Sequence, residues 1–259
     1  MTEASVILRQ NDNIAVILLN RPQSSNLISL DIASKLKVIC QRINENDSTR
    51  VVILTGVGDV FSRGRDVFAH NSYTPDLTIG QWLELHQVSR TLAELNVPSI
   101  AAINGDAIDH GLELALACDF RLATRGVRLG FTDLPKGIIP WDGGTQRLAR
   151  LIGRAKAMEL LLTSRKVETK EALSMGLISL VTQKNKVLAA AKGLAYDIAS
   201  SAPIAVRYTK EAVHKGMDLS LIQGLALEAD LSFLLQSTQD RIEGLTSFLE
   251  KRNPQYTGK

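Results

Sequence analysis

The first part of the chain alternates short apolar runs with segments whose apolar residues recur at helical spacing. "VILRQNDNIAVILLN" has two apolar runs on either side of Asn11-Asp12-Asn13, which predicts a β-hairpin. "LDIASKLKVICQRINEN" has helical spacing, and "RVVILTG" is a short apolar run typical of a buried strand. Strands separated by helices indicate an α/β protein with a layered βαβ-type fold.

The pattern changes near the middle of the chain. "WLELHQVSRTLAELN" predicts a helix that Pro98 ends, "SIAAING" a strand, "GLELALACDF" a helix and "RLATRGVRLGF" a strand pair. From "GGTQRLARLIGRAKAMELLL" onward the signals are almost all helical, through "VLAAAKGLAYDIAS" and "IAVRYTKEAVHKG" to "LSLIQGLALEADLSFLLQ". We find no low-complexity linker between the two regions and no repeat of fixed period, so a solenoid is not expected.

One glycine pair invites a dinucleotide-binding interpretation. Gly56-Val57-Gly58 follows the strand "VVILTG", but a dinucleotide fingerprint needs a third glycine where Phe61 stands, with a helix opening there. The sequence continues instead into "SRGRD". A plain turn is the better prediction, because isolated Gly-x-Gly pairs are common at turns.

Composition narrows the possible functions. The 259 residues are 45% apolar and 22% charged, which is ordinary for a globular protein, and a net charge of +3 with scattered basic residues argues against nucleic-acid or membrane partners. Cys40 and Cys118 form no metal or disulfide pattern, and Cys118 is expected to be a core residue. The N-terminal segment has no basic or apolar targeting region, so we expect a cytoplasmic protein.

The first candidate for chemistry is Glu113. It lies in a segment, beginning near His110, that is apolar on every side, which predicts a buried helix. A carboxylate there either pairs with an arginine or has a raised pKa. The first turn of the helix presents free backbone N–H groups, which suit a developing oxyanion. A carboxylate one turn away is placed for general acid–base catalysis.

A second candidate follows the strand "VVILTG" at Gly64-Arg65-Asp66. Gly64 allows the backbone to approach a ligand closely, and the amide of Arg65 would then face a site. The guanidinium would remain available for a phosphate or a carboxylate. From the residue types alone, a charged surface turn is an equally good interpretation.

Several motifs together resemble one family. "LNRPQSSNLISLDIASKL", "VVILTGVGDVFSRGRDV", "PSIAAINGDAIDHGLELALACDFRLAT", "GIIPWDGGTQRLARLIG" and "AMELLLTSRKVETKEALSMGLISLV" follow one another as in the enoyl-CoA hydratase/isomerase (crotonase) family. The tail "RIEGLTSFLEKRNPQY" fits as well. The resemblance covers nearly the whole chain.

The resemblance implies the crotonase fold, in which ββα units repeat in a spiral and a helical region follows. Residues 1–200 would form the core with the acyl-CoA site, and residues 201–259 a helical trimerisation region of the same continuous unit. Family members usually form trimers or hexamers and stabilise a thioester enolate with two backbone N–H groups. No metal or redox cofactor is implied, because CoA enters as part of the substrate.

Mapped onto this chain, the oxyanion donors are Arg65 and His110, where hydratases usually have a glycine in place of His110. The two usual catalytic glutamates correspond to Glu113 and Asp133. In the implied hydration of a 2-enoyl-CoA, Glu113 takes a proton from water and Asp133 delivers one to C2. The resemblance implies substrate contacts at Arg21, Gly64, Asp66, Val67, Gly111, Trp141 and Lys251.

Three departures leave alternatives open. Asp133 is one C–C bond, about 1.5 Å, shorter than glutamate, so it is either the second acid or a turn cap. Asp142 stands where many hydratases have a small apolar residue, and is either a third catalytic carboxylate or a helix cap. His110 and Trp141 favour an unusual acyl group. An isomerase, a cyclic dienoyl-CoA hydratase or a C–C hydrolase on the same fold therefore remain alternatives to a simple hydratase.

Two functions outside catalysis are further alternatives. Some family members are reported to bind RNA, which would call for a lysine-rich face interleaved with aromatic residues. With 5% aromatic residues and scattered charge, the sequence argues against this function. A purely structural subunit is the other alternative, and the carboxylates at positions 113 and 133 argue against it.

Overall fold

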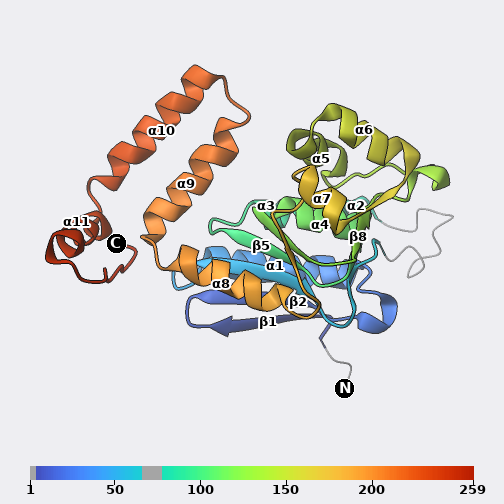
Figure 1. Ribbon diagram of the computed structural model, residues 1–259, viewed down its shortest axis with the longest axis horizontal. Coiled ribbons are helices and arrows are strands. Elements are labelled where there is room, and N and C mark those ends of the chain that lie inside the picture. The colour runs from blue at the N-terminus through green and yellow to red at the C-terminus, as the bar shows by residue number, and fades with distance from the viewer. Residues whose placement is uncertain (1–3, 66–77) are drawn as a thin grey trace.

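The computed structural model describes residues 4–65 and 78–259, and within them two β-sheets form the body of the molecule (Figure 1). The larger sheet has six strands in the order β1-β2-β3-β5-β7-β10. The strands β1 and β2 pair antiparallel, and every later neighbour is parallel. The strand bounds are β1 Val6–Asn11, β2 Ile14–Leu19, β3 Val51–Gly56, β5 Ser99–Ile103, β7 Phe120–Thr124 and β10 Leu180–Thr182.

The smaller sheet has four short strands in the order β4-β6-β8-β9 among the described residues. The strands β4, β6 and β8 are parallel neighbours, and β9 is antiparallel to β8. From β3 to β8, consecutive strands alternate between the two sheets. The strands β3, β5 and β7 belong to the large sheet, and the strands that follow them, β4, β6 and β8, belong to the small one. The bounds are β4 Val60–Ser62, β6 Asp106–Ile108, β8 Arg128–Gly130 and β9 Lys166–Glu168.

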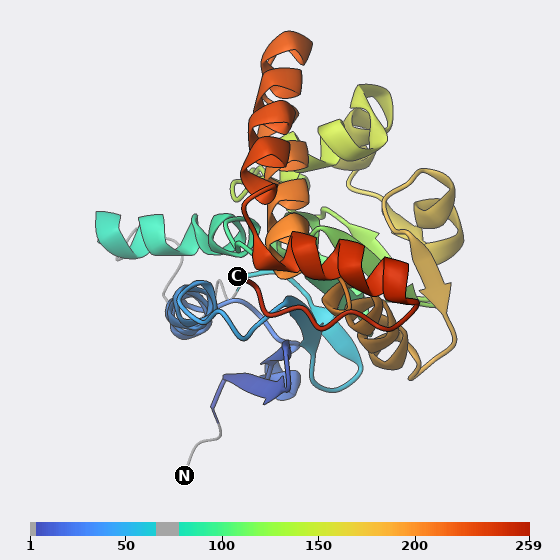
Figure 2. The ribbon, with the colours of Figure 1, turned by 90° about the vertical axis from the view of Figure 1, so that its left-hand side faces the viewer.

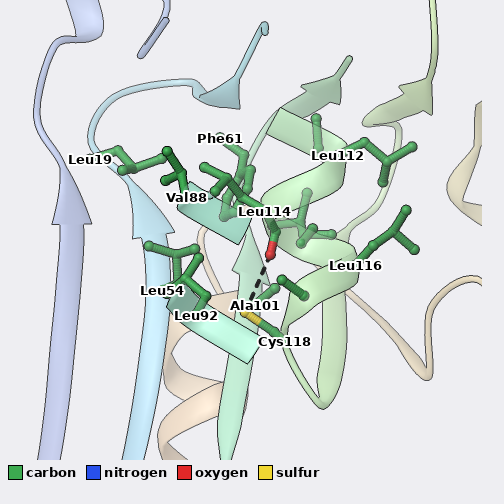
Figure 3. Packing of buried hydrophobic residues seen from close by; sticks show 14 of the residues in the cluster. Leu19, Leu54, Phe61, Val88, Leu92, Ala101, Leu112, Leu114, Leu116 and Cys118 are labelled. Carbon is green, nitrogen blue, oxygen red and sulfur yellow. Dashed lines mark hydrogen bonds between the residues drawn. The ribbon is translucent and has the colours of Figure 1, made fainter. Parts of the chain in front are cut away.

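Helices cover both faces of the large sheet. The main core lies between one face and the helices α1 (Leu30–Asn44), α3 (Val88–Ala93) and α4 (His110–Ala117). Figure 3 shows leucines of α3 and α4 packed on strand residues there. The opposite face is covered by α8 (Val187–Ala199), whose buried residues include three alanines that let the helix lie close to the strands. Burial raises the pKa of the Cys118 thiol to about 12, as expected of a core cysteine.

The C-terminal helices project from this body. The helices α9 (Pro203–Gly216) and α10 (Leu221–Leu235) lie side by side, and α11 (Gln239–Glu250) lies at one end of the long axis (Figures 1 and 2). No residue of α9 is buried, and Leu231 is the one buried residue of α10. Large apolar side chains are exposed along the last two helices, namely Leu221, Ile222, Leu225, Phe233, Leu234, Ile242, Leu245, Phe248 and Leu249.

The predicted hairpin, the buried strand at residues 51–56 and the plain turn at Gly58 are confirmed. Gly58 has a φ of 82°, and the chain continues into β4 rather than into a helix.

The body also contains the helices α5 (Gly144–Ile152), α6 (Arg154–Thr163) and α7 (Thr169–Ser174).

Three predictions about the elements were wrong. The helix expected over residues 82–96 is two helices, α2 (Ile79–Leu85) and α3, separated at residues 86–87. The strands expected to pair within "RLATRGVRLGF" are β7 and β8, which belong to different sheets. The region expected to be almost all helical contains β9 and β10, each three residues long and therefore too short to show a periodic pattern.

Polar contacts tie α9 to the body at Asp119. Its carboxylate bonds Lys210 Nζ at 2.9 Å and His214 Nε2 at 2.6 Å, both from α9, and accepts the Ser99 N–H at 2.7 Å. Burial disfavours the ionised form, but these partners outweigh it and lower the pKa of Asp119 to about 2. Because the folded-state pKa lies below the ordinary value of 3.8, ionised Asp119 stabilises the fold above that pH, and the stabilisation is lost as the pH falls toward 2.

Asp119→Asn is therefore expected to lower the free energy of unfolding at pH 7 by about 2 kcal/mol, the equivalent of the pKa shift. The difference from the unsubstituted protein should shrink between about pH 4 and pH 3, measured by urea denaturation. Asp47→Asn is the control, because Asp47 is exposed and 3.6 Å from Arg207. If Asp119→Asn lowered the free energy of unfolding by the same amount at pH 7 and at about pH 3, the proposed link between Asp119 ionisation and stability would be wrong.

Within residues 4–65 and 78–259, none of the helices combines the length and apolarity needed to cross a bilayer. The same part of the chain has no group of three or more His, Cys, Asp or Glu side chains arranged to hold a metal ion.

Candidate active site

The candidate residues follow three neighbouring strands of the small sheet. Arg65 follows β4, and Asp133 follows β8. Asp109 comes directly after β6, and His110 is the next residue. Because β4, β6 and β8 are parallel, their carboxyl ends lie at the same edge of the sheet. The ββα arrangement thus brings together segments that are far apart in the sequence.

Gly64 allows two of these segments to approach. Its φ is 106°, and a Cβ at this position would lie 3.3 Å from the Asp109 Cβ and 3.6 Å from the Ile108 carbonyl oxygen. Among the hydrogen bonds between described residues, none uses the backbone N–H of Arg65 or of His110. Both N–H groups therefore remain available to an acceptor from a ligand, as an oxyanion hole requires.

Glu113 lies inside α4, all of whose residues are buried, and is 2% exposed. Its Oε1 accepts the N–H of Asp142 at 2.9 Å and that of Gly144 at 2.8 Å. Burial raises the pKa of Glu113, although the charge of His110 and the two N–H groups act in the opposite direction. No arginine or lysine pairs with Glu113 among the described residues, so the buried salt bridge considered from the sequence is not formed.

Asp142 faces away from the helix that follows it. Its Oδ2 lies 3.0 Å from His110 Nε2 and accepts the Ser89 N–H at 2.6 Å. The cap position of α5 is Gly143, with no side-chain cap bond. The alternative that Asp142 caps this helix is therefore wrong. Its carboxylate instead joins α3, α4 and the segment before α5.

A small cavity of ≈ 10 Å³ lies between these segments, with room for about one water molecule. Trp141 lies against it, with Arg65 Cζ 3.6 Å above the Trp141 ring and the His86 ring 3.9 Å away. Burial lowers the pKa of the Arg65 guanidinium, which the charges of Asp133 and Glu113 oppose. The cavity is lined by Arg65, Asp109, His110, Glu113, Phe131, Asp133, Ile138, Ile139, Pro140 and Trp141.

Asp133 also lines the cavity. Its side chain is 25% exposed and bonds Lys136 Nζ at 2.8 Å. Asp133 stands at the start of the short helix Leu134–Lys136, but its side chain makes no cap hydrogen bond there. The alternative that Asp133 caps this turn is therefore wrong. Asp109 is different, because its carboxylate accepts the backbone N–H and, at 2.7 Å, the hydroxyl of Thr132. Burial raises the pKa of Asp109, and the Thr132 bonds oppose that rise.

The other predicted contacts are spread more widely. Gly111 packs against β4, where a Cβ would lie 2.2 Å from the Ser62 carbonyl oxygen, so its role is close packing of α4. Arg21 precedes the short helix Pro22–Ser24, and its N–H donates to Asn26. Lys251 ends α11, away from α4 in this chain (Figure 1). Asp66 and Val67 lie outside the described residues.

Ser89, Thr132 and Gly144 are contacts that the sequence reasoning missed. Ser89 and Thr132 carry no pattern that separates them from other serines and threonines. Gly144 could have been found, because it belongs to a glycine pair at a predicted helix start.

The chain is similar to known proteins over nearly its whole length. A sequence profile of the enoyl-CoA hydratase/isomerase family matches residues 9–259. Crotonyl-CoA hydratase of Syntrophomonas wolfei is 35% identical over 265 residues, covering 100% of both chains. Short-chain-enoyl-CoA hydratase of Clostridium acetobutylicum is 34% identical over 249 residues, covering 96% of this chain and 95% of that protein.

The crystal structure of an enoyl-CoA hydratase from Bacillus anthracis superposes with a TM-score of 0.93 at 39% identity, covering 98% of this chain and 100% of that one. The chain thus belongs to the enoyl-CoA hydratase/isomerase family. The crotonase fold expected from the resemblance is confirmed.

Proposed function

We propose that this protein hydrates a 2-enoyl-CoA thioester, adding water across C2 and C3. The observation that carries the proposal is the buried Glu113 carboxylate, which is held by two N–H groups. In the part of the chain that the structure describes, the N–H groups of Arg65 and His110 near it donate to no other residue. Enzymes of the family act on acyl-CoA substrates. The names of the two relatives above, both hydratases, support hydration as the reaction.

The proposed reaction begins at the thioester carbonyl. The N–H groups of Arg65 and His110 donate to its oxygen, and they stabilise the negative charge that develops there when water adds to C3. Removing one such donor typically costs about 10²–10³ in rate. Because both donors belong to backbone fixed by Gly64 and by α4, they need no rearrangement as the charge develops.

Glu113 is the proposed base. It takes a proton from water as the water oxygen bonds C3, and the π electrons move to the thioester oxygen to give the enolate. A base of raised pKa is closer to the pH at which general acid–base catalysis is most effective. The enolate then needs a proton at C2. Asp133, which the family resemblance implies as the donor, lines the same cavity.

The CoA portion is the part of the substrate that the enzyme holds at a distance from the reacting carbons. Arg21 and Lys251 are proposed contacts of its phosphates, since both carry a positive charge. Lys251 lies apart from α4 within one chain (Figure 1), so a contact with CoA would reach the site of a neighbouring copy. The proposed chemistry uses water and groups of the chain, with CoA as part of the substrate.

Double-bond isomerisation is the second candidate. The observation that favours it is a further buried carboxylate, Asp142, within the hydrogen-bond network of Glu113. An isomerase moves a proton between two carbons of the acyl chain, and a second acid–base group near Glu113 would assist this transfer. Trp141 and His110 both line the cavity beside Glu113, and these two bulky side chains are our reason to include an unusual acyl group, such as a cyclic one, in the same candidate.

A panel of acyl-CoA thioesters tests the proposal. The panel contains straight 2-enoyl, 3-enoyl, cyclic dienoyl and β-diketone acyl groups, and mass spectrometry follows gain of water and loss of CoA. Hydration predicts gain of one water from a 2-enoyl-CoA. Conversion of a 3-enoyl-CoA at constant mass, detected by chromatography, would support isomerisation instead. No change in any thioester would contradict both.

We further propose that the chain assembles into a trimer or hexamer through its C-terminal helices. Exposed apolar residues of α10 and α11 include Phe233 at 76% and Phe248 at 81% exposure, which is unusual for helices facing water. Light scattering at micromolar protein concentration is expected to give the mass of three or six chains. Phe233→Glu should lower that mass, whereas Lys192→Glu, on α8, should not. A stable monomer of the unsubstituted chain would contradict the proposal.

A further inference from the structure

His110 and Asp142 form a buried pair beside Glu113. The distance from His110 Nε2 to Asp142 Oδ2 is 3.0 Å, and the two side chains are 3% and 2% exposed. The same oxygen accepts the Ser89 N–H at 2.6 Å. The pair is therefore fixed from three directions, by α3, by α4 and by the segment that leads into α5.

The hydrogen-bond pattern assigns one proton on the imidazole. Asp142 Oδ2 already accepts the Ser89 N–H, and we assign His110 Nε2 as the donor in its contact with the same oxygen. Proton exchange is thereby left to Nδ1. This atom is buried and has no hydrogen-bond partner among the described residues. Buried polar atoms without partners are rare in folded proteins and call for an explanation, of which a catalytic role is one.

His110 also shares the cavity of the reacting groups. It lines the same ≈ 10 Å³ cavity as Glu113 and Arg65. The pair is joined to Glu113 directly, because the Asp142 N–H donates to Glu113 Oε1 at 2.9 Å. Asp133, by contrast, is 25% exposed and is bonded to Lys136. The group best enclosed with Glu113 is therefore the imidazole.

We propose that His110, held by Asp142, is the second proton-transfer group of this site and gives C2 its proton. The inference rests on the proposed hydration. Glu113 removes a proton from water as the C3–O bond forms, and the π pair moves to the thioester oxygen. The C2–H bond of the product then forms as the Nδ1–H bond of His110 breaks, and the pair of electrons from that bond stays on Nδ1. This leaves an imidazole with a proton on Nε2 alone, and a protonated Glu113. A proton returns from Glu113 to His110, so one water is consumed per turnover.

The arrangement explains why His110 and Asp142 occur together in this chain. A carboxylate that holds one imidazole nitrogen orients the ring, and it balances the charge when the other nitrogen is protonated. Asp142 acts through His110 and is a positioning residue. Each residue buried without the other would leave an uncompensated polar group, at a cost in stability.

The test compares His110→Asn, Asp142→Asn, the double variant and Asp133→Asn. Each is assayed for kcat and KM with the 2-enoyl-CoA that the unsubstituted enzyme hydrates, and for deuterium entry at C2 in D₂O. His110→Asn keeps the backbone N–H, so KM should stay within about threefold while kcat and deuterium entry fall by about 10²–10⁴. The double variant should be no slower than His110→Asn, because the two residues act as a unit. Asp133→Asn should lose less activity than His110→Asn.

A larger loss in Asp133→Asn than in His110→Asn would overturn the inference and return the role to Asp133. If the fold loss in kcat of the double variant equals the product of the two single losses, the two residues act independently and the proposed joint action is wrong. If His110→Asn does not fold, His110→Gln gives the same readouts, and Asp142→Glu should recover part of the rate lost in Asp142→Asn. If the unsubstituted enzyme hydrates no thioester, the proposed function fails. If it does hydrate and His110→Asn keeps its rate, the inference alone fails.

Discussion

Glu113→Gln is expected to lower the rate of enoyl-CoA hydration by about 10²–10⁴, the usual contribution of general acid–base catalysis. The physical reason is the loss of a base at constant side-chain volume. The glutamine carbonyl can still accept the N–H groups of Asp142 and Gly144, which now hold Glu113 Oε1. The melting temperature should therefore change little, because the buried hydrogen bonds are kept.

The measurement is kcat/KM from the absorbance of the conjugated thioester, with circular dichroism as the check on folding. Glu94→Gln is the matched control, because Glu94 is exposed and pairs with Arg90 on the surface. Full activity in Glu113→Gln would mean that Glu113 serves only to hold the segment at residues 142–144. The proposed mechanism would then be wrong at its central residue.

Gly144→Ala is expected to lower kcat/KM by about a hundredfold. An added Cβ would lie 2.9 Å from Glu113 Oε1, 2.7 Å from the Pro140 Cβ and 2.8 Å from Phe131 Cε1. Something must move, and the carboxylate of Glu113 is among the atoms displaced. A misplacement of about 1 Å at a reacting group can cost about 10² in rate, and overpacking costs about 1–3 kcal/mol of stability.

The matched control is Gly193→Ala in α8. This glycine is exposed, and a Cβ there would have no atom within 4 Å. Alanine should leave activity unchanged and raise the free energy of unfolding by up to about 1 kcal/mol, the difference in helix propensity. Unchanged activity of Gly144→Ala, measured in the same assay, would mean that the Glu113 carboxylate tolerates displacement.

The fold could be predicted from the sequence wherever the hydrophobic pattern extends over enough residues. The hairpin at residues 6–19 and the helices at residues 30–44 and 187–199 lie where the pattern predicts them. Glu113 stands out in a sequence because one carboxylate in an otherwise apolar helix is costly unless it is satisfied. The short strands β9 and β10 have too few residues to show periodicity, and the helix break at residues 86–87 has no glycine or proline to mark it.

The contacts of the site were less predictable, because they depend on side chains meeting across long stretches of sequence. His110 and Asp142 are 32 residues apart, and each has an adequate local interpretation, one as an amide donor and the other as a cap. Asp133 has a local partner, Lys136, three residues away. Only the three-dimensional arrangement distinguishes a carboxylate tied to a surface lysine from one tied to a buried imidazole.

The residue before α4 also affects the unfolded chain. Asp109 has φ 50° and ψ −123°, a conformation that favours glycine and costs a side-chain-bearing residue about 1–3 kcal/mol. Its carboxylate offsets part of this cost through the two bonds from Thr132. Compared with a glycine, Asp109 also has fewer conformations to lose on folding, but at a positive φ the strain outweighs this gain. The turn that presents the His110 N–H is thus held by side-chain bonds to Thr132, so the position of this donor depends on a residue outside α4.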